Sequence, residues 1–359
     1  MRARAFAKIN LSLRVLGARP DGYHELRTIF QSIALHDTLT IRSVAGPFRL
    51  TCDDRSLACD RTNLVCRAAE RLWKASRRRG APRGVAIHLS KCIPVQAGLG
   101  GGSSDAAATL RALAKLWRVD PQLVRESAVM LGADVPYFLE GGTVLGLERG
   151  DVLFPLVDRP RQWVVLVIPS FGVSTKEAYG WLDESCRHQH SLLSRGAPPS
   201  PIAAGTPPPP QLLGACAPRD SSRLSRADAL APPRSRVSRT ERRNEQTNAG
   251  TRIRSVSDGS RAGVGPRAGL RNVDGDNDGH NDLEAIVAQR YPEIARIVRA
   301  LRRAGSSSAA MSGSGSAVFG LFDTRTSALD AAGALKRATR RVIVTRTLTR
   351  AECRRLAAK

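Results

Sequence analysis

The feature that most constrains this chain is a glycine-rich stretch at residues 94–105, which reads Pro-Val-Gln-Ala-Gly-Leu-Gly-Gly-Gly-Ser-Ser-Asp. Residues 84–90 alternate apolar and polar side chains as a half-buried strand does, and residues 103–117 carry apolar side chains at helical spacing. Glycines let the backbone approach a ligand closely, and the start of a helix offers unpaired N–H groups to an anion. The stretch therefore predicts a phosphate-binding loop, with Ser103 or Ser104 as the helix N-cap.

Two better-known phosphate-binding patterns are excluded by the same residues. A Walker A loop needs Gly-Lys-Ser or Gly-Lys-Thr, and no lysine follows these glycines. A dinucleotide-binding fingerprint needs the G-x-G-x-x-G frame with an acidic residue placed downstream, and this stretch lacks both. A flexible turn is the remaining alternative. We expect Asp105 in the first helical turn, where the helix dipole favours an anion.

Length and charge bound the class of protein. The 359 residues predict two domains, and 42% hydrophobic residues are enough to build a core. The formal net charge of +24 suits nucleic acid or anionic small molecules as partners, but arginine-rich composition also follows from a GC-rich genome. The sequence offers neither a long apolar run nor a signal-peptide core, so we expect a cytoplasmic protein without membrane contact.

Residues 187–280 have a different composition from the rest of the chain. Their 94 positions contain no Phe, Trp or Tyr and hold 11 of the 21 prolines. They carry 15 Arg, no Lys and 8 acidic residues, so their net charge is 15 − 8 = +7. Such a stretch buries too little apolar surface to offset the entropy of ordering it. We interpret it as a disordered insertion.

The second half of the chain reads as alternating strands and helices around this insertion. Pro292 predicts a break between two helices. The predicted strands are residues 162–168, 317–322 and 342–348, and the predicted helices are residues 282–304, with that break, and 326–340. The total is an α+β chain in two lobes.

The glycine-rich stretch resembles the ATP-binding loop of the GHMP kinases, which phosphorylate small alcohols. Other segments resemble those members of the family whose substrate is a polyol linked to cytidine diphosphate. These segments are Ala7-Lys-Ile-Asn-Leu-Ser-Leu, Arg19-Pro-Asp-Gly-Tyr-His-Glu-Leu, Leu131-Gly-Ala-Asp-Val-Pro-Tyr-Phe and Met311-Ser-Gly-Ser-Gly-Ser-Ala-Val-Phe. Together the matching segments cover about 1–185 and 281–350. Gln96 stands where many relatives carry Gly.

The resemblance implies a two-lobed fold. Residues 1–160 would form an ATP-binding α/β lobe like ribosomal protein S5, and residues 161–359 a ferredoxin-like α+β lobe. The insertion 187–280 would interrupt the second lobe. Because the cost of closing a loop grows only logarithmically with its length, such an insertion is tolerable if its ends lie close together.

The resemblance also implies the catalytic residues. Asp134 would be the base, although a lone Asp before Pro is more often a helix cap or turn former. Lys8 lies in an apolar, strand-like segment, where a lysine is either solvated at an edge or buried and paired. We expect it to be paired with Asp134 and to orient the substrate hydroxyl. Asn10, two residues along the same strand, would face the same way and bind the substrate.

The remaining site residues come from the family match alone. Tyr23 would stack on the cytosine, His24 would bond its edge, and Tyr179 would be the second aromatic. The other implied substrate-binding residues are Thr175, Gly313 and Ser314. The implied ATP-binding residues are Asn63, Leu64, Lys91, Pro94, Gly98, Leu99, Gly100, Gly101, Gly102, Ser103 and Ser104.

Mg²⁺ is expected with ATP, bound mainly through the phosphates, because no carboxylate cage is visible. Residues 274–279 begin like a calcium loop, but its twelfth position is Ala285 instead of Glu, so we expect no calcium site.

We expect ATP and a small molecule as ligands, with monomer and homodimer both open. The rival hypotheses are a GHMP kinase for another alcohol, nucleic-acid binding through the insertion, and partner binding through Pro207–Pro210. The insertion lacks aromatic residues for base stacking, which argues against nucleic acid.

Overall fold

The computed structural model describes residues 1–195 and 279–357 of the chain. The interpretation of an insertion therefore falls largely outside the described residues, as do the Pro207–Pro210 segment and the start of the calcium-like segment. The described residues form one compact unit with two β-sheets. The fold is mixed α and β, as the sequence predicted.

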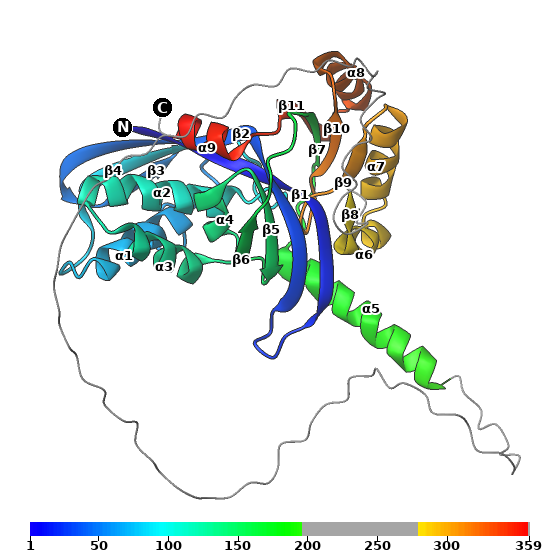
Figure 1. Ribbon diagram of the computed structural model, residues 1–359, viewed down its shortest axis with the longest axis horizontal. Helices are drawn as coiled ribbons and strands as arrows, with labels where there is room; N and C mark the ends of the chain where they lie inside the picture. Colours follow the sequence, from blue (N-terminus) through cyan, green and yellow to red (C-terminus); the bar gives the residue numbers. More distant parts are fainter. Residues whose placement is uncertain (196–278, 358–359) are drawn as a thin grey trace, which may run out of the picture. The chain divides into compact units, whose positions relative to one another are not determined.

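The larger sheet is built around a long antiparallel hairpin of two strands, β1 and β2 (Figure 1). Its strand order is β3-β4-β2-β1-β8, and β5 pairs with β2 and with β6. The bounds are β1 Arg2–Ala18, β2 His24–Pro47, β3 Arg49–Cys52, β4 Arg83–Ser90, β5 Thr143–Glu148, β6 Val152–Pro155 and β8 His280–Asn281. The strand predicted over residues 84–90 is confirmed as β4.

Helices α1 Leu64–Ala75, α2 Gly101–Trp117, α3 Pro121–Leu131 and α4 Val135–Glu140 pack together against this sheet. Their apolar faces form one core with the sheet, in which the rings of Trp73 and Trp117 meet edge to face at 5.0 Å. The predicted helix over 103–117 is confirmed as α2, but its expected cap is wrong. Gly100, with φ of 70°, is the N-cap, so the helix begins two residues before Ser103.

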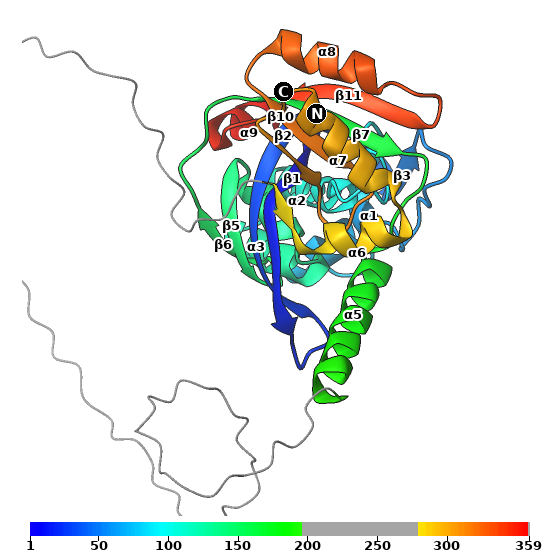
Figure 2. The same ribbon diagram turned by 90° about the vertical axis from the view of Figure 1, so that its right-hand side faces the viewer.

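The smaller sheet has the order β11-β7-β10-β9, and helix α8 lies along β11 (Figure 2). Its strands are β7 Trp163–Pro169, β9 Ser308–Met311, β10 Val318–Phe322 and β11 Arg340–Arg346. The helices of this half are α5 Thr175–Arg195, α6 Asp282–Arg290, α7 Glu293–Arg303, α8 Arg325–Leu335 and α9 Arg350–Ala357. The predicted strands and the break at Pro292 are confirmed, since Pro292 caps α7. Helix α8 ends five residues earlier than predicted.

Helix α5 continues beyond Arg187, where the sequence placed the start of the insertion. Residues 187–195 of the helix therefore belong to the segment that the sequence assigned to the insertion. Residues 181–195 contain neither Gly nor Pro, so nothing local ends the helix before Gly196. The absence of aromatic residues marks a change in composition, but it does not stop a helix.

The chain re-enters the described unit against its own N-terminal strand. The N–H of Gly279 donates to the carbonyl of Leu11 at 2.7 Å, and β8 then pairs in parallel with β1. The side chain of Asn281 accepts from the N–H of Leu283, which caps α6. Its Nδ2 donates to the carbonyls of Met311 and Gly313, both at 2.8 Å. One buried amide thus connects the returning chain to the loop after β9.

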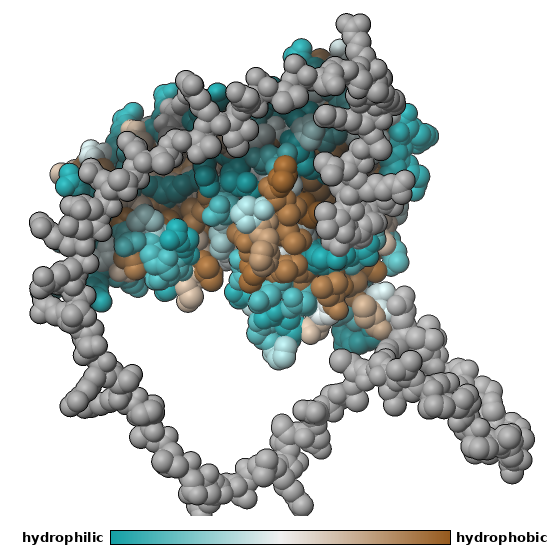
Figure 3. Space-filling model, in the orientation of Figure 1, coloured by the Kyte–Doolittle hydropathy of each residue, from teal (hydrophilic) through white to brown (hydrophobic). Residues whose placement is uncertain are grey.

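The surface carries an apolar patch over β5 and β6 (Figure 3). Its exposed side chains include Val152, Phe154 and Val157, the last 91% exposed. Within residues 1–195 and 279–357, no helix has the length and apolar character needed to cross a bilayer.

We expect Asn281→Ala to lower the free energy of unfolding by about 2–4 kcal/mol, because it removes a helix cap and two hydrogen bonds to buried carbonyls. Urea denaturation of the full chain measures this. The control is Thr324→Ala, which removes the exposed N-cap of α8 and should cost about 1 kcal/mol. A loss for Asn281→Ala no larger than the control's would contradict the structural role of this amide.

Candidate active site

A cavity of about 1090 Å³ is lined by residues of the larger sheet, of helices α1, α2 and α5, and of the loops around them, including the loop between β9 and β10. Most of the predicted site residues line it. They are Lys8, Asn10, Tyr23, His24, Leu64, Lys91, Pro94, Gly98, Leu99, Gly100, Gly101, Gly102, Ser103, Asp134, Thr175, Tyr179, Gly313 and Ser314. The fold therefore brings together side chains that lie up to 306 positions apart in the sequence.

Two predicted ATP-binding residues do not line the cavity. Asn63 is the N-cap of α1, where its side chain accepts from the N–H of Val65 and donates to the carbonyl of Ala58. Ser104 is buried, and its hydroxyl donates to the carbonyl of Phe6 at 2.6 Å. Both side chains are occupied in holding the backbone around the cavity.

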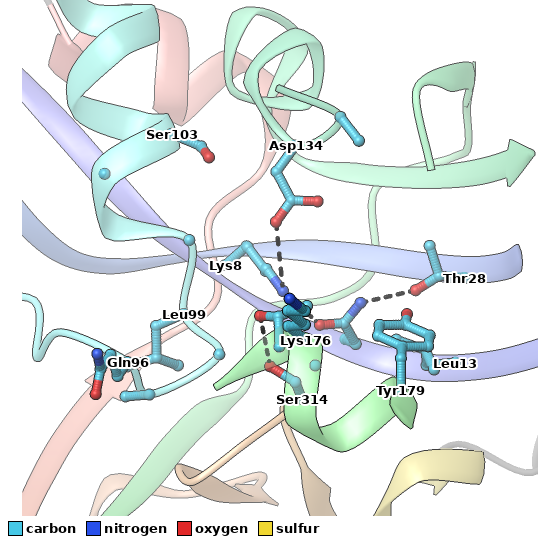
Figure 4. A pocket seen from close by; sticks show the side chains of 18 of the residues that line it. Lys8, Leu13, Thr28, Gln96, Leu99, Ser103, Asp134, Lys176, Tyr179 and Ser314 are labelled. Carbon is cyan, nitrogen blue, oxygen red and sulfur yellow. Dashed lines mark hydrogen bonds and ion pairs between the residues drawn. The ribbon is translucent and has the colours of Figure 1, made fainter. Parts of the chain in front are cut away.

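The Lys8 ammonium is buried at the floor of the cavity (Figure 4). Its Nζ donates to Oδ1 of Asn10 at 2.6 Å and lies 3.9 Å from Oδ2 of Asp134. Asn10 in turn donates to the hydroxyl of Thr28, which donates to the carbonyl of Ser12. Burial lowers the pKa of Lys8, and the charge of Asp134 offsets part of that effect. Of the two environments that the sequence allowed, the buried and paired one is present.

Asp134 stands at the N-cap position of α4, but its side chain makes no capping hydrogen bond. Its carboxylate points toward Lys8 instead, with about a third of the side chain exposed. The alternative interpretation of Asp134 as a helix cap therefore fails on geometry. A carboxylate that is held by an ammonium, and still open to a cavity, can accept a proton from a bound hydroxyl.

The glycine-rich loop lies between β4 and α2 and approaches other parts of the backbone closely. A Cβ on Gly98 would collide with the carbonyl of Ser312, and one on Gly100 would come within 2.6 Å of the Phe138 ring. Both glycines have φ of 70°, which also disfavours any side chain. The first turn of α2 has no side-chain cap, so its N–H groups are available to an anion in the cavity.

The backbone conformation of Gln96 shows why many relatives carry glycine at this position. Its φ of 52° lies in the left-handed region, which side chains rarely adopt. Its carbonyl accepts from the N–H of Val173, so the strained residue links the glycine-rich loop to the segment before α5.

A second loop, residues 312–317, closes the floor beside Lys8. The hydroxyl of Ser312 donates to the carbonyl of Gly98 at 3.0 Å, and the N–H of Ala317 donates to the carbonyl of Ala97. A Cβ on Gly313 would lie 3.1 Å from Nζ of Lys8, so glycine leaves room for the ammonium. The sequence allowed this segment to be a linker, whereas it is a tight loop between β9 and β10.

The far end of the cavity holds aromatic rings. The rings of His24 and Tyr179 are stacked at 4.6 Å, and Nε2 of His24 lies 2.8 Å from Oδ1 of Asp183. Tyr23 is half exposed, and the guanidinium of Arg149 lies 5.1 Å from its ring centroid. His24 thus lies against the face of Tyr179, and the expected stacking of Tyr23 and Tyr179 on a cytosine stays a prediction.

A buried charge cluster behind the glycine-rich loop was missed by the sequence analysis. Nζ of Lys91 donates to Oδ2 of Asp37 at 2.5 Å and to Oδ2 of Asp105 at 2.9 Å. The expectation that Asp105 lies in the first turn and faces the dipole is wrong, because α2 begins earlier and the side chain turns inward. Arg149, Lys176 and Asp183 also line the cavity without having been predicted. No local pattern distinguished these residues.

Comparison with known proteins agrees with this architecture. Residues 63–142 match the family described as GHMP kinases N terminal domain, and residues 269–340 match GHMP kinases C terminal. The mevalonate kinase of Methanococcus jannaschii has the same fold, with a TM-score of 0.57 at 13% identity over 97% of this chain and 98% of that one. The two lobes and the glycine-rich loop are those of a GHMP kinase.

Relatives with similar sequences indicate which group of GHMP kinases the chain resembles. Relatives named 4-diphosphocytidyl-2-C-methyl-D-erythritol kinase include those of Pelotomaculum thermopropionicum (38% identity, 96% of this chain and 97% of the relative) and Moorella thermoacetica (40% identity, 96% and 98%). A crystal structure of 4-(cytidine 5'-diphospho)-2C-methyl-D-erythritol kinase matches with a TM-score of 0.63 at 29% identity, over 97% of this chain and 99% of that one. The chain belongs to the 4-diphosphocytidyl-2-C-methyl-D-erythritol kinase family.

The buried cluster gives a prediction about pH. Burial, with the charge of Asp37 adding to it, raises the pKa of Asp105 from 3.8 to about 8, although Lys91 opposes the shift. Between about pH 4 and pH 8 the unfolded chain loses this proton while the folded chain keeps it. Stability should therefore fall as pH rises through that window, and Asp105→Asn should remove this contribution.

Urea denaturation of wild type and Asp105→Asn at several pH values measures the effect. We expect the wild type to lose stability relative to the variant as pH rises from about 4 to 8. A constant difference across that range would contradict a proton on Asp105.

Proposed function

We propose that this protein transfers the γ-phosphoryl group of ATP to the 2-hydroxyl of 4-diphosphocytidyl-2-C-methyl-D-erythritol. The products are the 2-phosphate and ADP, and the reaction belongs to the non-mevalonate pathway to isopentenyl diphosphate. The observation that carries the proposal is one cavity with three parts. The Lys8–Asp134 pair lies at its floor, an uncapped helix start and glycine-rich loop at one end, and the His24 and Tyr179 rings at the other.

The catalytic step needs a proton acceptor beside the attacking hydroxyl. We assign this role to Asp134, whose carboxylate is open to the cavity. The hydroxyl oxygen forms a bond to the γ-phosphorus, the bond from that phosphorus to the bridging oxygen of ADP breaks, and the hydroxyl proton passes to Asp134. Lys8, 3.9 Å from the carboxylate, orients it and stabilises negative charge on the transferring group.

Asn10 is assigned to the acceptor side. Its Oδ1 is held by Lys8 and its Nδ2 by Thr28, so the amide has a fixed orientation. Ser314 and Thr175, whose hydroxyls lie 3.0 Å apart, connect the second loop to the start of α5. These groups are placed to hold the diphosphate of the substrate between the floor and the aromatic end.

The phosphates of ATP fit the glycine-rich loop, because the first turn of α2 offers N–H groups that no side chain caps. Mg²⁺, when bound with ATP, neutralises charge on the phosphate oxygens. The described residues contain no group of three or more His, Cys, Asp and Glu side chains able to hold a metal ion. The metal would therefore be held mainly by the phosphates themselves.

The aromatic end supports recognition of the cytosine. We assign Tyr179 and Tyr23 to stacking on the base and His24 to its polar edge. The stack of His24 on Tyr179 must then open, or the base must stack on the exposed face of the pair. Asp183 fixes His24 through a 2.8 Å contact, so the imidazole keeps a defined orientation in either case.

The first test is ATP turnover by the full chain with Mg²⁺ and four acceptors: the cytidyl polyol, mevalonate, homoserine and galactose. We expect turnover with the cytidyl polyol alone, because the other three acceptors have no base that could stack on the aromatic rings. Turnover with another acceptor would keep the phosphate loop and overturn the cytosine assignment. Absence of turnover with all four would overturn the proposed activity.

Asp134→Asn should lower kcat by roughly 10²–10⁴-fold, the usual contribution of a positioned base. The free energy of unfolding should also fall, because the substitution removes the charge that partly offsets the burial of the Lys8 ammonium. Steady-state kinetics measures the first effect and urea denaturation the second. A variant with near-wild-type kcat would show that another group accepts the proton.

Tyr179→Ala should raise KM for the cytidyl substrate about tenfold, since stacking on a base contributes roughly 1–3 kcal/mol. KM for ATP should stay within about twofold, because Tyr179 and the glycine-rich loop lie at different ends of the cavity. The conservative control is Tyr179→Phe, which keeps the ring. Equal changes in both KM values would indicate a general disturbance of the site.

A further inference from the structure

A cluster of one lysine and two aspartates lies behind the first turn of α2. Its members come from three elements: Asp37 from β2, Lys91 from the residue after β4, and Asp105 from α2. All three side chains are at most 6% exposed. Charged groups are seldom buried to this degree without a specific role, because removing them from water is costly.

The cluster is adjacent to the phosphate-binding loop. A Cβ on Gly101, the first residue of α2, would lie 3.3 Å from Nζ of Lys91. The main-chain N–H groups of Cys92 and Ile93 donate to Oδ1 of Asp37 at 2.6 and 2.8 Å. Asp37 therefore fixes the strand end that leads into the loop, and it holds Lys91 through its other oxygen.

The hydrogen bonds of Lys91 leave one direction open. An ammonium has three N–H donors, and two of them are used by Asp37 and Asp105. Within the part of the chain that the structure describes, the third has no partner. Lys91 is one of the residues that line the cavity, and its side chain is 6% exposed.

Asp105 has one satisfied oxygen and one orphaned oxygen. Its Oδ2 accepts from Lys91, whereas its Oδ1 is buried without a hydrogen-bond partner among the described residues. Such an arrangement costs stability, and Lys91 would keep a partner in Asp37 if Asp105 were apolar. A second aspartate is thus not needed to neutralise the ammonium. Its hydrogen bond instead fixes the direction in which the ammonium points.

We propose that Asp105 is a positioning residue for ATP: together with Asp37 it holds the Lys91 ammonium so that its third N–H donates to the nucleotide in front of the glycine-rich loop. The inference rests on the proposed function, since it needs ATP in this cavity. It separates the two carboxylates by role. Asp37 ties the ammonium to the backbone, and Asp105 sets the direction in which it points.

The test compares Asp105→Leu with Asp105→Asn in the full chain. Leucine branches at Cγ as aspartate does but cannot accept a hydrogen bond, whereas the asparagine amide oxygen can still accept from Lys91. We expect Asp105→Leu to raise both Kd and KM for ATP about 10–100-fold, the range for losing a hydrogen bond to a charged group. Asparagine should restore both to within about threefold. At saturating ATP, kcat and KM for the cytidyl substrate should stay within about twofold in both variants.

The matched control is Thr109→Val, one helical turn further along the same buried face. Its hydroxyl donates to the main-chain carbonyl of Asp105, so the substitution disturbs the packing of α2 without reaching Lys91. It should leave Kd for ATP unchanged. If Asp105→Leu does not fold, Asp105→Ser serves the same purpose, because its hydroxyl is too short to reach Nζ.

Calorimetric titration of ATP with Mg²⁺ reads binding without the cytidyl substrate. A folded Leu or Ser variant that binds ATP as tightly as the wild type would overturn the proposal, as would equal losses for ATP and the cytidyl substrate. If the wild type binds ATP but does not turn over the cytidyl polyol, the proposed acceptor is wrong and the comparison at Asp105 still decides. A wild type that does not bind ATP overturns both proposals.

Discussion

The contact between two glycine-rich loops, backbone against backbone, is the constraint on which the rest of the molecule depends. Gly98 leaves no space for a Cβ beneath the carbonyl of Ser312, and Ala317 and Ala97 are joined by a main-chain hydrogen bond. One loop precedes α2 in the larger-sheet half and the other joins β9 to β10 in the smaller sheet. Because no side chain separates them, the phosphate end and the floor of the cavity have a fixed distance.

The two buried lysines of the cavity lie in different electrostatic environments. Lys8 faces one partly exposed carboxylate and a neutral amide, and its pKa is lowered by burial. Lys91 lies between Asp105 and Asp37, both buried, and they raise its pKa against the opposing effect of burial. The pKa of Lys8 is therefore the more sensitive of the two to the negative charge of a bound substrate. Lys91 is a permanent cation with a fixed direction.

Features that a local sequence pattern encodes were predicted correctly. The glycines of residues 98–102, between a periodic strand and a periodic helix, were sufficient to predict a phosphate loop. Three strands of the smaller sheet were predicted, whereas the short β9 was not. The family match supplied Asp134 and Tyr179, which no local pattern singled out. The Asp37–Lys91–Asp105 cluster was not predictable, because its members are 54 and 14 positions apart and meet only when three elements pack. The stack of His24 on Tyr179 was missed for the same reason.

The pairing of β1 with β8 joins residues 12 and 280, and Asn281 then secures the loop beside Lys8. During synthesis at the ribosome, β1 emerges first but its outer edge stays without a partner until nearly four-fifths of the chain has been made. The cavity floor is completed later still, when residues 312–317 have been synthesised. The catalytic site is therefore completed late in the synthesis of each chain, because its floor needs contacts between residues that are far apart in the sequence.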